Sequence, residues 1–243
     1  MSSEPSIDYR MSHTGREKAE AYVRNYRIMR WRRYLWRCER EYLSRVLTDL
    51  RLSGLDYLDF ACGSGRILAH LAPAMASALG IDVSESMLQQ CQETHPKVEV
   101  ICADLTRSDP VPERMFDLVT AFRFFPNAED QLRVDAMLAL SRKVKPNGVL
   151  IFNNHKHAGN IVYRARNVLG RPNRAMTHSQ ALSLVSMAGL KVEEIRGFGI
   201  LPSDERWMAF PGFIHRVADA TAAWLGVDMQ FGQDLVYVCR KAG

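Results

Sequence analysis

The chain has 243 residues, of which 47% are hydrophobic and 24% are charged, and its formal net charge is +5. This hydrophobic content is enough for a packed core and excludes a generally disordered chain. The longest apolar runs are far shorter than the ~18 residues that span a bilayer, and the first ten residues lack the apolar core of a secretory signal. We therefore expect one cytoplasmic domain over residues 1–243.

Cysteine usage agrees with a reducing compartment. The five cysteines are odd in number, and none forms a CxxC pair or a Cys/His pair with metal-ligand spacing. We expect reduced, mostly buried thiols and no metal site. Cys62 lies inside a glycine turn, where we expect a small packing residue rather than a nucleophile.

The N-terminal part predicts a polar start followed by a helix. Residues 1–15 are polar, and we expect them to be disordered. Residues 17–50 have a helical pattern, with one apolar stripe and an arginine face on the opposite side. We expect this segment to be an N-terminal helical cap. The stripe consists of Ile28, Trp31, Leu35, Cys38, Tyr42 and Val46, and the arginine face consists of Arg30, Arg33, Arg37 and Arg40.

Short apolar strands and amphipathic helices alternate over the remaining chain. This alternation predicts an α/β fold, a doubly wound and mostly parallel seven-stranded sheet covered on both faces. A basic segment, residues 154–176, interrupts the alternation after the fifth strand and is expected to be an insertion or lid. Two helices are expected to begin at capping boxes, Asn127 with Asp130 and Thr177 with Gln180. The expected strands are residues 57–60, 76–81, 98–102, 117–122, 149–153, 192–195 and 235–240.

The most informative motif is L-D-F-A-C-G-S-G-R-I-L at residues 58–68. Gly63 and Gly65 allow a turn tight enough for the backbone to approach a ligand. The acids Asp59, Asp82 and Asp104 follow three successive strands, whose carboxyl ends meet at one edge of a parallel sheet. Asp82 suits a ribose diol and Asp104 an exocyclic amine, while the helix start after the turn favours a carboxylate. The pattern indicates a nucleoside with a carboxylate-bearing tail.

NAD is the competing ligand, because its fingerprint also places an acid after a glycine turn. Two residues argue against it. Leu68 occupies the third glycine position, so the close packing around a pyrophosphate is missing. Asp59 would repel a pyrophosphate and instead suits a cationic group such as an ammonium or a sulfonium.

These motifs resemble those of class I S-adenosylmethionine-dependent methyltransferases that act on small molecules. The likeness rests on L-D-F-A-C-G-S-G-R, G-I-D-V-S-E-S-M-L, A-D-L and F-D-L-V-T-A-F-R-F-F, and it covers about residues 55–155. It implies the Rossmann-like methyltransferase fold and S-adenosylmethionine as the methyl donor. Ala61 departs from the glycine that the family often has there.

The resemblance also implies roles for single residues around the donor. Asp82 would hold the ribose, Asp104 would meet the adenine amine, and Phe122 would face the sulfonium. The methionine part would lie against Asp59, Ala61, Gly63 and Gly65, and the adenine against Val83, Met87 and Leu105.

On the acceptor side the sequence offers two candidate catalytic residues. His155 follows the fifth strand and is a candidate general base for a hydroxyl acceptor; the alternative is a solvated loop histidine. Arg123 follows the fourth strand and either binds an acceptor anion or forms a structural ion pair. His157 lies nearby, and His215 is expected to be structural.

The charge is concentrated in two segments. Residues 24–45 contain eight arginines against two glutamates, and residues 154–176 contain five basic residues and no acid. If both flank the pocket, they favour an anionic small-molecule acceptor, such as a sugar- or phosphate-bearing compound or a natural product, methylated on oxygen. A solvated basic face is the alternative reading.

Two other functions remain open. One is a nucleic-acid methyltransferase acting on tRNA or rRNA, which we do not favour because no RNA-binding module is appended. The other is a non-catalytic cofactor-binding protein, or a peripheral membrane protein that uses the N-terminal helix. The sequence predicts neither the acceptor's identity nor the oligomeric state.

Overall fold

The computed structural model describes residues 9–11, 15–169, 175–204 and 207–243. Residues 1–8 and 12–14, most of the range predicted to be disordered, lie outside the described residues. Tyr9–Met11 differ from that prediction, because they form a 3-10 helix whose first two residues contact the main body.

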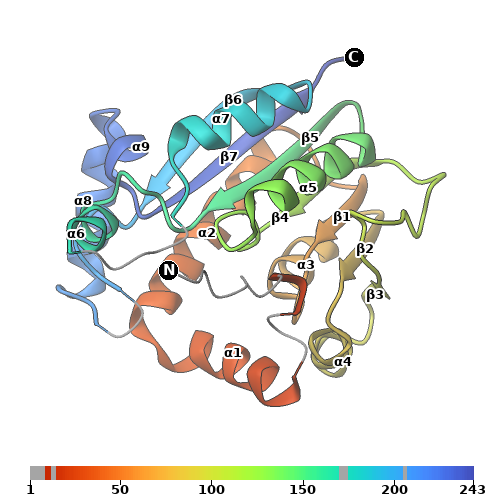
Figure 1. The fold of residues 1–243 in the computed structure, drawn as a ribbon, viewed down its shortest axis with the longest axis horizontal. Helices are drawn as coiled ribbons and strands as arrows, with labels where there is room; N and C mark the ends of the chain where they lie inside the picture. The colour runs from red at the N-terminus through yellow and green to blue at the C-terminus, as the bar shows by residue number, and fades with distance from the viewer. Residues whose placement is uncertain (1–8, 12–14, 170–174, 205–206) are drawn as a thin grey trace, which may run out of the picture.

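One seven-stranded sheet forms the centre of the molecule (Figure 1), which confirms the predicted fold class. Its strand order is β3-β2-β1-β4-β5-β7-β6. The pairs from β3 to β5 are parallel, and β7 runs antiparallel to both of its neighbours. The carboxyl ends of β1, β2, β4 and β5 therefore share one edge. The strands are β1 Asp56–Phe60, β2 Ser77–Asp82, β3 Glu99–Cys102, β4 Phe116–Ala121, β5 Val144–Asn154, β6 Leu190–Phe198 and β7 Asp234–Lys241.

Helices cover both faces of the sheet because its central strands are apolar on both sides. In β4, Leu118 and Val119 belong to two different core clusters, one on each face. The helices α5 and α7 pack on one face, and α2, α3 and α4 pack on the other (Figure 1). The helices are α1 Arg16–Ile28, α2 Arg30–Asp49, α3 Arg66–Leu71, α4 Glu85–Thr94, α5 Asp130–Lys143, α6 Ile161–Val168, α7 His178–Met187, α8 Gly212–Trp224 and α9 Asp228–Phe231, with a 3-10 turn at Ala72–Ala74.

The N-terminal cap is two helices rather than the single helix expected over residues 17–50. Met29 separates α1 from α2 with an extended backbone, φ −78° and ψ 117°. The break lets α2 pack beneath the sheet while α1 turns away and contacts α4 (Figure 1). Tertiary packing therefore overrides a continuous helical pattern.

The two predicted capping boxes had different outcomes. Thr177 and Gln180 form the expected reciprocal box at the start of α7. The box at Asn127 was wrong: α5 begins at Asp130, and the Asn127 amide instead donates to the backbone oxygen of Arg123 at 2.7 Å. The residues predicted to be an insertion, 154–176, include α6, while residues 170–174 lie outside the described ranges. Within the described ranges, no helix combines the length and apolar character needed to cross a bilayer.

Candidate active site

A cavity of about 390 Å³ lies at the shared carboxyl edge of β1, β2, β4 and β5. Its size falls within the range of small-molecule sites. Ten of the twelve predicted site residues line it, and only Gly65 and Leu105 do not. The ten are Asp59, Ala61, Gly63, Asp82, Val83, Met87, Asp104, Phe122, Arg123 and His155.

The turn after β1 has a left-handed backbone at three positions, with φ of 53° at Ala61, 54° at Gly63 and 79° at Gly65. Gly65 also precedes α3, and a Cβ placed there would lie 2.4 Å from the sulfur of Cys91. Gly65 therefore shapes the turn from behind without lining the cavity. Leu105 is likewise buried in the core under α5.

Asp82 closes the turn onto the end of β2. One carboxylate oxygen accepts from the backbone N–H of Gly63 at 2.8 Å, and the other accepts from the N–H of Ser84 at 2.8 Å. Burial raises the pKa of Asp82, and these two backbone bonds oppose the rise. Each oxygen keeps a further lone pair, so the carboxylate can still accept hydroxyl donors from the cavity side.

Asp59 is turned inward rather than toward a cation. Its oxygens accept from the backbone N–H of Leu68 at 3.0 Å and from the Thr120 hydroxyl at 2.6 Å. Thr120 is in turn hydrogen-bonded to Tyr57 at 2.7 Å. Burial raises the pKa of Asp59 to about 7. The side chain ties β1 to α3 and β4, and so holds the turn in place.

This pKa predicts a pH-dependent stability. Between 3.8 and about 7, folded Asp59 keeps a proton that the unfolded chain has lost, so stability falls as pH rises through this window. In the wild type, Asp59 should lower the free energy of unfolding by up to about 1.4 kcal/mol for each pH unit in this window. The Asp59→Asn variant, whose side chain stays neutral, should lack this contribution. Urea unfolding at several pH values measures it. Parallel stability curves for the two proteins would contradict the assignment.

Asp104 is engaged by the N-terminal 3-10 helix. Its carboxylate pairs with Arg10 at 2.8 Å and accepts from the backbone N–H of Thr106 at 2.9 Å. The neighbouring Tyr9 packs edge-on against Phe124 and donates to the backbone oxygen of Arg123 at 3.2 Å. Tyr9 and Arg10 thus join the ends of β3 and β4 across one wall of the cavity.

His155 and Arg123 face the cavity from the ends of β5 and β4. His155 is buried, and its Nδ1 finds no hydrogen-bond partner among the described residues. Burial, reinforced by Arg123 and Lys156, lowers the pKa of His155 well below 6.5. The imidazole is therefore neutral at pH 7 and able to accept a proton.

Arg123 is held in a left-handed backbone conformation, with φ 64°. Its N–H donates to the Asn153 amide oxygen at 2.6 Å, and its guanidinium donates to the Tyr26 hydroxyl at 2.6 Å. Burial disfavours the Arg123 charge, but Tyr26 and Glu39 hold its pKa well above its ordinary value. A strained backbone beside a cavity is typical of a functional position.

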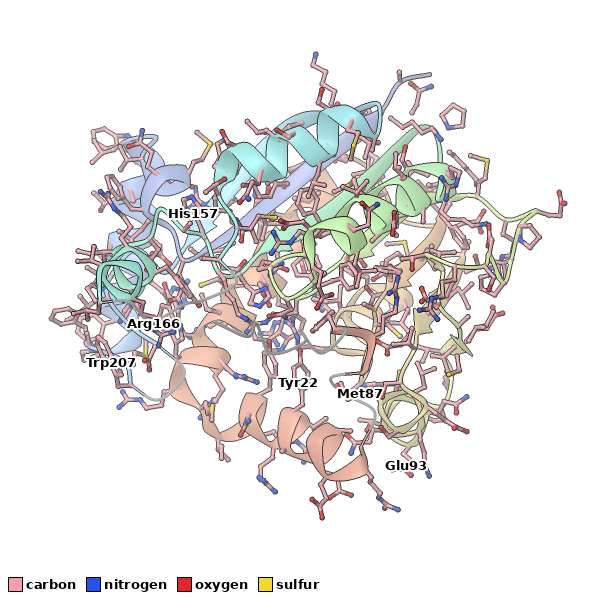
Figure 2. All side chains as sticks on the ribbon, in the orientation of Figure 1. Tyr22, Met87, Glu93, His157, Arg166 and Trp207 are labelled. Carbon is pink, nitrogen blue, oxygen red and sulfur yellow. The ribbon has the colours of Figure 1, made fainter. Side chains whose placement is uncertain are left out.

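Three further basic side chains line the same cavity: Arg32, Arg66 and Lys156. Arg66 pairs with the buried Glu39, and Arg32 lies over the rings of Tyr22 and Tyr26 at 5.7 and 5.4 Å. Figure 2 shows Tyr22 between α1 and the sheet. We call the set Arg32, Arg66, Arg123, His155 and Lys156 the basic wall. The glycine turn with Asp82 and Met87 lines the same cavity, and we call this second set the donor wall.

The arginine face predicted on the N-terminal helix does not line this cavity. Arg30, Arg33, Arg37 and Arg40 are exposed on α2. Arg164 and Arg166 of the basic segment do not line it either; Arg166 pairs with Asp204 at 3.2 Å. Arg171 and Arg174 lie outside the described residues. Both segments still reach the cavity through one basic residue each, Arg32 and Lys156.

Several lining residues were missed by sequence reasoning. Arg66 directly follows the glycine turn, so its place in the motif was a usable signal. Arg32 falls between the apolar stripe and the arginine face, and no pattern marked it. Tyr9 and Arg10 reach the cavity through contacts more than ninety positions away in the sequence, which local patterns do not reveal.

Known proteins share both this sequence region and this fold. A family model described as a methyltransferase domain matches residues 58–148. An uncharacterized methyltransferase of Schizosaccharomyces pombe is 34% identical over 119 residues, 44% of this chain and 41% of that protein. A ubiquinone biosynthesis O-methyltransferase of Methylococcus capsulatus is 34% identical over 109 residues, 42% of this chain and 44% of that protein. The chain thus matches less than half the length of either relative.

Solved structures extend the likeness over the whole chain. Magnesium protoporphyrin IX methyltransferase from Synechocystis, with bound SAM, superposes with a TM-score of 0.66 at 12% identity, covering 99% of this chain and all of that one. A possible histamine N-methyltransferase from Thermotoga maritima gives 0.63 at 15% identity, covering 94% and 98%. At these identities the superpositions establish the fold. The domain match adds that residues 58–148, which contain the glycine turn, Asp82 and Asp104, are similar to a methyltransferase domain.

Proposed function

We propose that the protein transfers a methyl group from S-adenosylmethionine to an oxygen of a small anionic acceptor. The observation that carries the proposal is that the donor wall and the basic wall line the same cavity. When bound, S-adenosylmethionine supplies a methyl group on a sulfonium. Much of the protein's work is then to position the two reactants and exclude water.

The residues of the donor wall fit such a donor. Asp82 has free lone pairs for two ribose hydroxyls, and the left-handed turn at Ala61 and Gly63 brings the backbone close to a ligand. The side chains of Val83 and Met87 offer apolar contact for an adenine. Asp104, held by Arg10, is placed to accept from an exocyclic amine. We infer that Tyr9, Arg10 and Tyr22 cover this part of the cavity.

The basic wall supports an anionic acceptor. Four cationic side chains, Arg32, Arg66, Arg123 and Lys156, line the cavity, and Arg66 is paired with the buried Glu39. A guanidinium binds two oxygens of a carboxylate or phosphate at once, which is why arginines favour such groups. The wall is therefore suited to an acceptor with a carboxylate or a phosphate.

Oxygen as the methylated atom is supported by His155. A hydroxyl must lose its proton as the new bond forms, and a neutral buried imidazole with an unpartnered nitrogen is placed to accept it. The relative from Methylococcus capsulatus is named an O-methyltransferase. We propose His155 as the general base and Arg123 as an acceptor-binding residue.

Transfer of a radiolabelled methyl group tests this function. Pairs of hydroxylated acceptors that differ only in a carboxylate or phosphate should show preference for the anionic member. Arg123→Gln should raise the KM for that member by about tenfold or more and leave the neutral one little changed. Arg142→Gln, at an exposed residue outside the cavity, is the matched control. Equal KM values for both variants, or a preference for neutral acceptors, would contradict the proposal.

A further inference from the structure

Helix α8 exposes large apolar side chains and buries polar ones. Phe213, Val217 and Trp224 are spaced by four and seven residues, which places them on one side of the helix. These side chains are 68%, 64% and 84% exposed. The polar residues His215 and Asp219 are buried instead. An ordinary surface helix has the reverse arrangement, with its apolar side toward the core.

A buried polar network fixes this orientation. Asp219 accepts from the Tyr34 hydroxyl at 2.7 Å and from the backbone N–H groups of Gly199 at 2.9 Å and Ile200 at 3.0 Å. The ring of His215 packs against Tyr34, with ring centres 5.3 Å apart. Rotating α8 to bury its apolar side would break all of these contacts. The buried contacts of Asp219 and His215 therefore keep the apolar side of α8 exposed.

Segments near α8 also expose large apolar side chains. Trp207 and Phe210 precede α8 and are exposed, as are Ile161, Val168 and Leu169 in and after α6. Arg166 of α6 pairs with Asp204, whose backbone N–H donates to the backbone oxygen of Trp207 at 3.0 Å. Figure 2 shows Arg166 and Trp207 together at one end of the molecule, far from Met87 in the cavity. We call this surface the α8 face: Ile161, Val168, Leu169, Trp207, Phe210, Phe213, Val217 and Trp224.

The charge on the helices beside the α8 face is predominantly positive. Helix α2 packs beside α8 through Tyr34 and Asp219, and Arg216 of α8 lies 3.7 Å from Glu41 of α2. The exposed side of α2 carries Arg30, Arg33, Arg37 and Arg40. Within residues 24–40, and within the described residues of 160–169 and 207–231, no carboxylate is exposed. Arg37 pairs with the exposed Glu41 at 3.1 Å, so the row of four arginines keeps an excess of positive charge. An apolar, aromatic surface next to such a row is complementary to a layer of anionic lipid headgroups over acyl chains.

We propose that the α8 face docks on an anionic membrane surface, with its aromatic and aliphatic side chains at the headgroup boundary and the α2 arginines on the phosphates. A second copy of the chain fits less well, because a symmetric contact through this face would bring two arginine-rich helices together. The proposal does not depend on the methyl acceptor.

Vesicle co-sedimentation of the full chain tests this docking. The protein should bind phosphatidylcholine vesicles rich in phosphatidylglycerol at least about tenfold more tightly than pure phosphatidylcholine vesicles. Val217→Glu should abolish binding, and Arg33→Glu should weaken it. Met187→Glu, at an exposed apolar residue of α7, is the matched control and should bind as the wild type does.

Two results would overturn the proposal. One is wild-type protein that fails to sediment with anionic vesicles, or a Val217→Glu variant that binds as well as Met187→Glu. The other is a dimer in analytical ultracentrifugation that Val217→Glu dissociates, without vesicle binding, since a second copy would then be the occupant. S-adenosylhomocysteine titration of each variant verifies that it is folded, and failure of the wild type in that titration concerns the proposed function alone.

Discussion

Replacement of Asp82 by alanine is expected to weaken S-adenosylhomocysteine binding by about 100-fold, measured by isothermal titration. Hydrogen bonds to a charged acceptor contribute about 1.5–3 kcal/mol each, and a ribose diol would donate two. The variant also removes the acceptor that holds the Gly63 N–H at 2.8 Å and the Ser84 N–H at 2.8 Å, so the turn loses its fixed position. Both effects weaken the binding of S-adenosylhomocysteine to the donor wall.

The matched control for this variant is Glu85→Ala. Glu85 is an acid three positions later, exposed at the start of α4 and outside the cavity lining. Its loss should leave the affinity within about threefold, a change of less than 1 kcal/mol. If a folded Asp82→Ala protein binds as tightly as the Glu85→Ala control, the donor wall is wrongly assigned.

The second large effect is expected at His155. His155→Gln should lower kcat by about 10²–10⁴-fold with little change in KM, because a general base acts on the transition state more than on substrate binding. The lowered pKa sets the pH dependence. The neutral imidazole is fully present above its pKa, so the wild-type rate should hold as pH falls to 6.5 and decline only well below it. The variant should lack this decline.

His157→Gln provides the comparison for His155. His157 is also buried after β5, but its Nδ1 lies 3.1 Å from the backbone oxygen of Gly232, and the residue does not line the cavity. This control should keep most of its kcat, and a thermal unfolding measurement verifies that it is folded. A His155→Gln enzyme with near wild-type kcat, or one that keeps the acid-side decline, would exclude His155 as the base and favour an acceptor that arrives without a proton to lose.

The donor wall was largely predictable from sequence because its signals are local. The glycine turn, Asp82 and Asp104 each follow a short apolar strand directly. Parallel strands in neighbouring positions place such residues at a single edge without any long-range information. The structure brings Asp59, Gly63, Asp82 and Asp104 to one cavity for this reason. Sequence position did not reveal that Asp59 is bonded inward to Leu68 and Thr120.

The basic wall was less predictable because it is assembled from four separate parts of the chain. Helical periodicity indicated the exposed arginines of α2. The residue of α2 that lines the cavity is Arg32, which lies between the apolar stripe and the arginine face of that helix. The break at Met29 sets the path of α1, and no proline or glycine marks it. Asn127 matched a helix cap but bonds to Arg123, Tyr9 and Lys156 instead. These positions depend on packing between elements, which a single sequence pattern does not contain.

The central claim is that the cavity is built for S-adenosylmethionine rather than for a dinucleotide. The most direct measurement is isothermal titration of the full wild-type chain with S-adenosylhomocysteine and, separately, with NAD. The account predicts one S-adenosylhomocysteine bound per chain with an affinity in the micromolar range, about −8 kcal/mol, and no measurable binding of NAD. Binding of NAD, or absence of S-adenosylhomocysteine binding by the folded protein, would contradict it.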